Sequence, residues 1–162
     1  MAHDFILKLD GIKGDSTIKG HEDQIELDSF SWGVNQQGNA HTSSGAGAGK
    51  STCHDVSLTK LADSSSTDLA LACCTGKHIA KAELFIRKAG GDNEHVKYLT
   101  IELKDVYVTN YHLSGHAGGG LATESFSLNF AEIAMDHKLQ DAKGKGSSKG
   151  NMRYNVPKQQ KM

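Results

Sequence analysis

Residues 44–51 read SGAGAGKS and come close to the phosphate-binding loop of nucleotide-binding proteins. That signature is G-x-x-x-x-G-K-[ST], in which backbone N–H groups wrap the phosphates, the lysine pairs with them and the hydroxyl holds Mg²⁺. Gly49, Lys50 and Ser51 supply the second half, but Ser44 stands where the first glycine belongs. A working loop also leads into the N-terminus of a helix, whereas the residues after this stretch alternate like a strand. The pattern favours a closely packed glycine loop over a nucleotide site.

Nine histidines make a metal site the second chemistry to consider. His112 and His116 have the i, i+4 spacing of a zinc-binding helix, but no glutamate follows the first of them. Gly115 and the glycines at 118–120 disfavour a helix there. The other histidines are scattered without ligand spacing. The sequence therefore predicts no metal site and no cofactor.

The three cysteines are an odd set, and two of them, Cys73 and Cys74, are adjacent. Adjacent cysteines rarely bridge each other, so we expect free thiols, including Cys53, and synthesis in a reducing compartment. No serine or cysteine has a recognisable base beside it in the sequence. We therefore predict no catalytic residue and no enzyme.

The charge is spread unevenly along the chain. Net charge is −1 for the whole chain, +6 for residues 138–162 and therefore −7 for residues 1–137. We interpret residues 141–162 as a basic, flexible C-terminal tail because glycines and serines stand among the lysines. Alternatively, this basic tail makes an electrostatic contact with the acidic body of another copy. The near-neutral balance gives no basis for nucleic-acid binding.

The length and the apolar pattern describe a single domain. A chain of 162 residues is enough for one core of ordinary size. No stretch approaches 18 continuous apolar residues, so we expect no membrane insertion. Asp4 lies where a signal peptide carries positive charge, and no apolar region follows it, so we expect no signal peptide.

Apolar and polar residues alternate with a period of two through most of the chain, which is typical of strands with one buried face. The apolar members are Phe5/Leu7/Leu9, Ile25/Leu27, Val56/Leu58, Ala82/Leu84/Ile86, Leu99/Ile101/Leu103 and Phe126/Leu128/Phe130. In three segments the alternation slips by one residue, at about 28–29, 104–105 and 131–132. A slip moves the apolar set to the opposite face, so each marks a β-bulge or sharp bend, or a strand that a subunit interface buries on both faces.

Two segments depart from this alternation. Residues 63–68 offer N-cap oxygens, residues 69–74 are small and apolar, and Gly76 can end a helix in the left-handed conformation, so we predict one short flanking helix over about 63–76. Residues 37–51 lack hydrophobic anchors and are predicted to form an extended loop. The fold class is mainly β: a single β-barrel-like domain of bulged antiparallel strands.

Six motifs follow one another within residues 3–137: SFSWG at 29–33 with Gln36, GAGAGK at 45–50, LTK at 58–60, AC at 72–73 with GKH at 76–78, IRKAGG at 86–91 and LNFA at 128–131. In these motifs and their order the chain resembles the hemolysin-coregulated protein (Hcp) family, the tube protein of the bacterial type VI secretion system.

The resemblance implies an Hcp-like β-barrel domain over residues 1–140, with the tail at 141–162 beyond it. It implies a homohexameric ring whose rings stack into a hollow tube, a contractile sheath and tip proteins as partners, and secreted effectors carried and protected in the lumen. It also implies synthesis in the bacterial cytoplasm and export without a signal peptide. The alternatives are a monomeric ligand-binding β-barrel and a P-loop nucleotide-binding protein.

The sites of a tube subunit are contact surfaces, and the strand predicted at 29–34 offers one of them. Its bulky residues take one face and leave Ser29 and Ser31 on the other. We predict that Ser29 and Ser31 face the lumen, where hydroxyls can hydrogen-bond varied cargo directly or through water. The alternative places Ser31 on an outer, solvent-facing surface.

Contacts between rings need residues that allow close approach, or complementary charge. We predict the first at the tip of the 37–51 loop, at Ala46, Gly47, Ala48, Gly49 and Lys50, because small residues let backbones approach closely. We predict a contact through complementary charge between the basic tail of one copy and acidic residues of another, such as Glu22 and Asp23.

Overall fold

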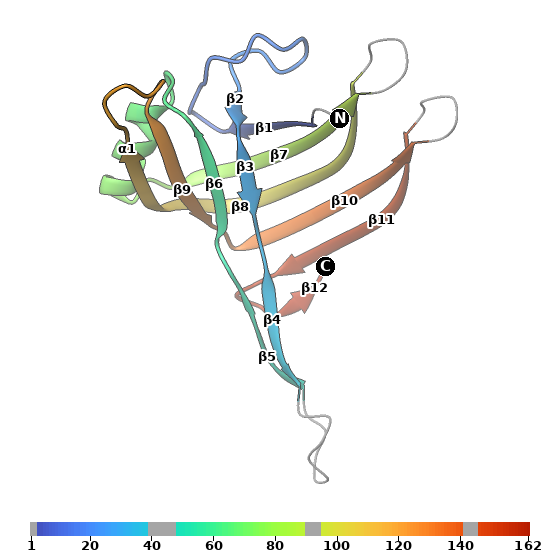
Figure 1. The fold of residues 1–162 in the computed structure, drawn as a ribbon. Helices are drawn as coiled ribbons and strands as arrows, with labels where there is room; N and C mark the ends of the chain where they lie inside the picture. Colours follow the sequence, from blue (N-terminus) through green and yellow to red (C-terminus); the bar gives the residue numbers. More distant parts are fainter. Residues whose placement is uncertain (1–2, 39–47, 90–94, 141–145) are drawn as a thin grey trace.

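Two antiparallel β-sheets face each other across one core in the computed structural model, which describes residues 3–38, 48–89, 95–140 and 146–162 (Figure 1). The elements are β1 (His3–Leu9), β2 (Ile25–Leu27), β3 (Ser29–Ser31), β4 (Val34–Gly38), β5 (Ala48–Cys53), β6 (Val56–Leu61), α1 (Ser66–Thr75), β7 (Ile79–Ala89), β8 (His95–Ser114), β9 (Thr123–Asn129), β10 (Glu132–Gln140), β11 (Gly146–Asn155) and β12 (Gln160–Lys161). The large sheet runs β12–β11–β10–β8–β7–β1–β2, and the small sheet runs β3–β6–β9–β8. The prediction of a mainly β, barrel-like domain with one short helix is confirmed.

Strand β8 belongs to both sheets. Its first half, up to Val106, pairs with β7 and β10, and its second half, from Tyr107, pairs with β9. Between them Asp105 adopts a left-handed backbone with φ 54°, which is uncommon for a residue other than glycine. The strand therefore turns its buried side from one sheet to the other at this residue.

The three predicted slips coincide with three of the places where the chain changes sheets; a fourth change, from β6 to β7, runs through α1. The chain leaves the large sheet after Leu27 and enters the small one at Ser29, and it returns from Asn129 to Glu132. The third slip is the turn at Asp105 within β8. Each slip in the alternation is thus a corner of the barrel.

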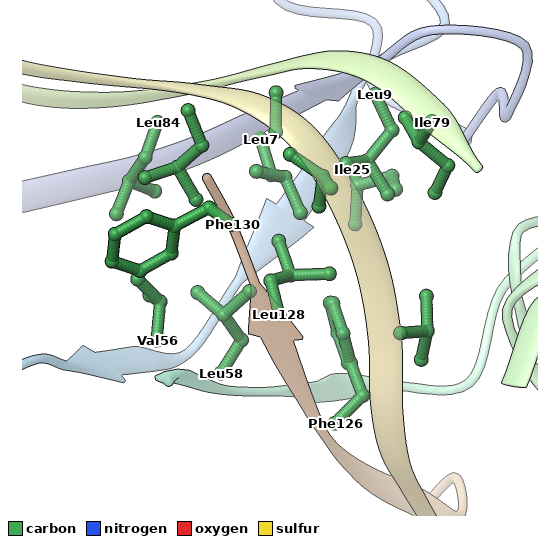
Figure 2. Packing of buried hydrophobic residues seen from close by; sticks show 14 of the residues in the cluster. Leu7, Leu9, Ile25, Val56, Leu58, Ile79, Leu84, Phe126, Leu128 and Phe130 are labelled. Carbon is green, nitrogen blue, oxygen red and sulfur yellow. The ribbon is translucent and has the colours of Figure 1, made fainter. Parts of the chain in front are cut away.

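The core fills the space between the sheets. Leu7 and Leu84 from the large sheet lie opposite Val56, Leu58 and Leu128 from the small sheet, and all five side chains are at most 2% exposed (Figure 2). Burial of aliphatic side chains on this scale is the main stabilising contribution, at about 1.5–3 kcal/mol for each one.

Helix α1 forms where it was predicted and covers one end of the barrel. The N-cap residue, Ser65, makes no side-chain cap hydrogen bond; the Asp63 carboxylate accepts its backbone N–H at 2.8 Å and orders the turn before the helix. Gly76, with φ 64°, ends it. Leu69 and Ala72 are buried against the core. No helix in the described ranges has the length and apolar character that crossing a bilayer requires.

A buried ion pair joins the helix start to the small sheet. Lys60 Nζ of β6 lies 2.8 Å from Glu124 Oε2 of β9, and both side chains are fully buried. The same ammonium donates to Asp63 Oδ1 at 2.7 Å, and the hydroxyl of Tyr111 donates to Glu124 Oε1 at 3.0 Å. Burial, together with this hydrogen bond to a carboxylate, raises the pKa of Tyr111 to about 12. The hydroxyl therefore stays protonated and continues to donate.

The prediction of a flexible tail over residues 141–162 is wrong for most of that segment. Gly146–Asn155 forms β11 and pairs with β10 along its length, and β12 pairs with the end of β11. Met152 and Tyr154 of β11 pack against the core, which the high glycine, serine and lysine content of the segment obscured. Residues 141–145 lie outside the described residues.

The extended loop predicted over residues 37–51 is a two-stranded ribbon for the part that the structure describes. Strand β4 pairs with β5 from Val34 opposite Cys53 to Gly38 opposite Ala48. The ribbon points away from both sheets (Figure 1), and every residue of β4 is exposed. Residues 39–47 lie outside the described residues.

The Lys60–Glu124 pair generates a stability prediction. We expect Lys60→Met to lower the free energy of unfolding by about 3–5 kcal/mol, because Glu124 would remain buried without its counter-charge. The double variant Lys60→Met/Glu124→Gln removes both charges and keeps an acceptor for Tyr111, so it should recover most of the loss. Urea unfolding of the parent and both variants measures this. A double variant no more stable than the single one would contradict the explanation.

Candidate functional site

The outer face of the small sheet is covered by hydroxyl groups. Strand alternation points the apolar residues of β6 and β9 into the core, and the residues between them point outward. We call this surface the hydroxyl face, and its members are Ser29, Ser31, Ser57, Thr59, Ser114, Thr123, Ser125 and Ser127, together with Asn110 and His112.

The strand register arranges these side chains in rows across the sheet. One row is Ser29, Thr59, Ser125 and His112; the next is Ser31, Ser57, Ser127 and Asn110. Two pairs are hydrogen-bonded, Ser29 Oγ with Thr59 Oγ1 at 2.5 Å and Ser114 Oγ with Thr123 Oγ1 at 3.0 Å. Because each hydroxyl can both donate and accept, the surface offers hydrogen bonds of either kind to whatever lies against it.

No Lys, Arg, Asp or Glu side chain points outward from β3, β6, β9 or residues 107–114 of β8. The buried Lys60 and Glu124 point to the other side. A carboxylate at the margin, Asp55, accepts hydrogen bonds from Thr109 Oγ1 at 2.6 Å and Asn129 Nδ2 at 2.9 Å. The hydroxyl face thus carries no ammonium, guanidinium or carboxylate group, and His112 contributes its one imidazole.

The outer face of the large sheet is chemically different. Its cross-strand rows carry charges, as in the row Lys8, Glu83, Glu102, Ala134, Arg153. Lys81 forms ion pairs with Glu83 and with Glu102, the second at 3.5 Å between Nζ and Oε2, and the hydrogen bond to Glu83 raises the pKa of Lys81. The domain therefore has one neutral and one charged outer face, on its two different sheets.

Both lumen candidates from the sequence lie on the hydroxyl face. Ser29 and Ser31 are exposed on the edge strand β3, with Phe30 between them turned toward the core. The sequence reading missed the other members. The alternation around Val56 and Leu58, and around Phe126 and Leu128, held the signal that could have found them.

The structure divides the between-ring candidates. Ala46 and Gly47 lie outside the described residues, and Ala48, Gly49 and Lys50 belong to β5. A Cβ on Gly49 would stand 2.7 Å from the backbone oxygen of Gln37, so the close approach across the ribbon requires glycine. The Gln36 side-chain amide donates to the Gly49 carbonyl at 2.5 Å and holds the two strands together.

The nucleotide-binding alternative is wrong. Lys50 and Ser51 lie within strand β5, and the chain continues through Asp55 into strand β6. A phosphate loop needs its lysine at the start of a helix, where unpaired backbone N–H groups face the phosphates. In β5 the backbone pairs with β4 instead.

The remaining reactive groups form no cluster within the described ranges. No three His, Cys, Asp or Glu side chains there lie close enough together to hold a metal ion. The three cysteines are free, with Cys74 exposed and Cys53 half-buried. Burial raises the pKa of the Cys53 thiol, which keeps it in its less reactive protonated form.

Comparison with known proteins gives these surfaces a context. The family described as "Type VI secretion system effector, Hcp" matches residues 6–137. Protein hcp1 of Pseudomonas aeruginosa is 43% identical over 144 residues, which covers 89% of this chain and 88% of that protein. Hcp1 from Salmonella typhimurium superposes with a TM-score of 0.83 at 28% identity and covers both chains completely. A type six secretion system protein superposes with a TM-score of 0.91 at 27% identity, covering 99% of this chain and all of the other. The chain belongs to the Hcp family of type VI secretion system proteins.

Proposed function

We propose that this protein is the structural subunit of a type VI secretion tube: six copies close into a ring, the rings stack, and the hydroxyl face lines the channel. The observation that carries this proposal is the division of the surface into a neutral hydroxyl face on the small sheet and a charged face on the large sheet. Family membership supports it. In this role the protein is a carrier and a building block, not an enzyme.

A neutral wall of hydroxyls suits a channel for varied cargo. A charged wall would attract proteins of opposite charge strongly and repel the others, whereas hydroxyls exchange hydrogen bonds with water and with many polar surfaces. Secreted effectors are the proposed cargo, and the rows through Ser29 and Ser31 are the proposed contact. The charged face of the large sheet would then lie on the outside of the tube, toward solvent and toward a contractile sheath, with tip proteins at the tube's end.

The β4–β5 ribbon supports stacking. An isolated two-stranded ribbon is only marginally stable in water, so it gains stability when a partner covers it. All five residues of β4 are exposed, and Val34 among them is 49% exposed. A ring above or below is the proposed partner, and Lys50 adds a positive charge to that contact.

Light scattering coupled to gel filtration tests the ring. We expect a mass of about six times the 17.4 kDa chain, independent of added nucleotide or metal. The reason is that a head-to-tail interface which closes on itself gives one defined size. A mass equal to one chain would overturn the proposal in favour of a monomeric binding barrel, and an open series of sizes would argue against closure.

Replacing Ser31 by Gln tests the proposed channel wall. The longer side chain would cover neighbouring hydroxyls such as Ser57, so we expect retention of a co-expressed effector to fall by about tenfold, the equivalent of one or two lost hydrogen bonds. Thr67→Gln on α1 is the matched control, because Thr67 is exposed but lies outside the hydroxyl face. Both variants should keep the ring mass. Equal effector recovery with both variants would remove Ser31 from the wall.

Two glycines of the ribbon test stacking. Gly49→Val would push Cβ against the Gln37 backbone and deform the ribbon, whereas a Cβ on Gly38, in the opposite strand, meets nothing within 4 Å. We expect Gly49→Val to form rings that do not stack in electron micrographs and Gly38→Val to stack like the parent. Normal tubes from Gly49→Val would show that the ribbon is not part of the ring-to-ring contact.

A further inference from the structure

A row of positive charges crosses the outer face of the large sheet, where β7, β8 and β10 lie side by side (Figure 1). Strand pairing places Arg87 of β7 directly opposite Lys97 of β8, and Lys138 continues the row on β10. On its other side Arg87 lies opposite Asp4 of β1. Like charges directly opposite each other destabilise a sheet. The contact between Arg87 and Lys97 is therefore unfavourable unless a negative charge lies between them.

The guanidinium group of Arg87 is buried with one nitrogen unpaired. Arg87 is 6% exposed, and its Nη1 has no hydrogen-bond partner in the part of the chain that the structure describes. A buried donor without an acceptor keeps the full cost of its desolvation. A guanidinium also cannot lose its charge to reduce that cost. This nitrogen therefore points to an acceptor that another molecule supplies.

Two rings form the surroundings of Arg87. Phe85 lies on the same face of β7 and is 9% exposed, and the ring of His21, from the connection between β1 and β2, packs on it with 5.0 Å between the ring centroids. His21 is itself 4% exposed, and its Nδ1 lies 2.8 Å from Gln24 Oε1, which fixes the ring. Charges attract each other more strongly beside buried rings than in open water.

The side chain of Lys97 covers the same place. Lys97 is half-buried, and its Nζ lies 4.1 Å from the centroid of the Phe85 ring. No carboxylate of the described ranges forms an ion pair with this ammonium. Burial, and after it the charge of Arg87, lowers the pKa of Lys97. The stem of a lysine is flexible, so the ammonium can swing aside and open a path to Arg87 Nη1.

We propose that Arg87 and Lys97 form a binding site for an oxyanion, a phosphate or a carboxylate, with Phe85 and His21 as its walls. The planar guanidinium presents donors that match both kinds of oxyanion, and the ammonium adds a donor that can rotate toward it. The bound oxygens would accept from the unpaired Nη1 and separate the two positive charges. Free phosphate or a side-chain carboxylate of another protein could supply them. The site lies on the large sheet, away from the hydroxyl face, and does not depend on the proposed ring.

Equilibrium dialysis tests the site. The parent protein is dialysed against radiolabelled phosphate and, separately, radiolabelled acetate, while sodium chloride keeps the ionic strength constant. We expect saturable uptake of one anion per chain. Lys97→Met removes the ammonium and keeps an apolar stem on Phe85, so the dissociation constant should rise by about tenfold or more, the equivalent of one charge-assisted hydrogen bond. Lys104→Met is the matched control, because Lys104 is exposed on the same face of β8 outside the site. It should bind like the parent.

A second variant, Arg87→Met, should lose the uptake altogether. If that variant does not fold, Lys97→Met and its control decide. Uptake of either anion that falls in Lys97→Met and persists in Lys104→Met supports the inference, and the anion that binds more tightly identifies the source of the oxygens. The absence of saturable uptake by the parent overturns it, as does equal uptake by Lys97→Met and Lys104→Met. A chain that binds the anion but forms no ring would contradict only the proposed function.

Discussion

A strand can bury only one of its two sides in a given core. Strand β8 buries one side in its first half and the other side in its second half. It serves the large sheet up to Val106 and the small sheet from Tyr107, and the left-handed residue Asp105 rotates it between the two tasks. The hydrogen bond from His78 Nε2 to Asp105 Oδ1, at 2.8 Å, lies at this corner. The two sheets can face each other because one strand is continuous through both.

The two surfaces of the domain follow from this geometry. Each sheet gives one apolar side to the shared core and keeps an outer side, which in the large sheet is partly covered by the connection from β1 to β2, where His21 packs against Phe85. In the small sheet most outer positions are serine, threonine or asparagine, with His112 and Leu61 among them, and in the large sheet many outer positions are charged. One compact core thus supports a neutral surface and a charged surface that do not interfere with each other.

The polar interior has a different role from the polar surface. Lys60 and Glu124 are buried where an apolar pair could have packed, and they connect β6, β9 and the start of α1. Since both charges need a fixed partner, the pair tolerates one arrangement of helix and sheet. The hydroxyl face, by contrast, leaves its donors and acceptors to the surroundings.

The sequence by itself determined the strands from β1 to β3 and from β6 to β10, with their buried sides, the single helix and the three corners, because a period of two, an N-cap cluster and a slip in the alternation are local signals. The family resemblance could also be read from it. The tertiary structure alone decided that Ser31, Ser57, Ser127 and Asn110 form one row, since pairing between distant strands sets which outward residues become neighbours. It also decided that residues 146–155 are a strand. Their glycines, serines and lysines have low intrinsic preference for a sheet, and only pairing with β10 and packing of Met152 and Tyr154 on the core hold them there.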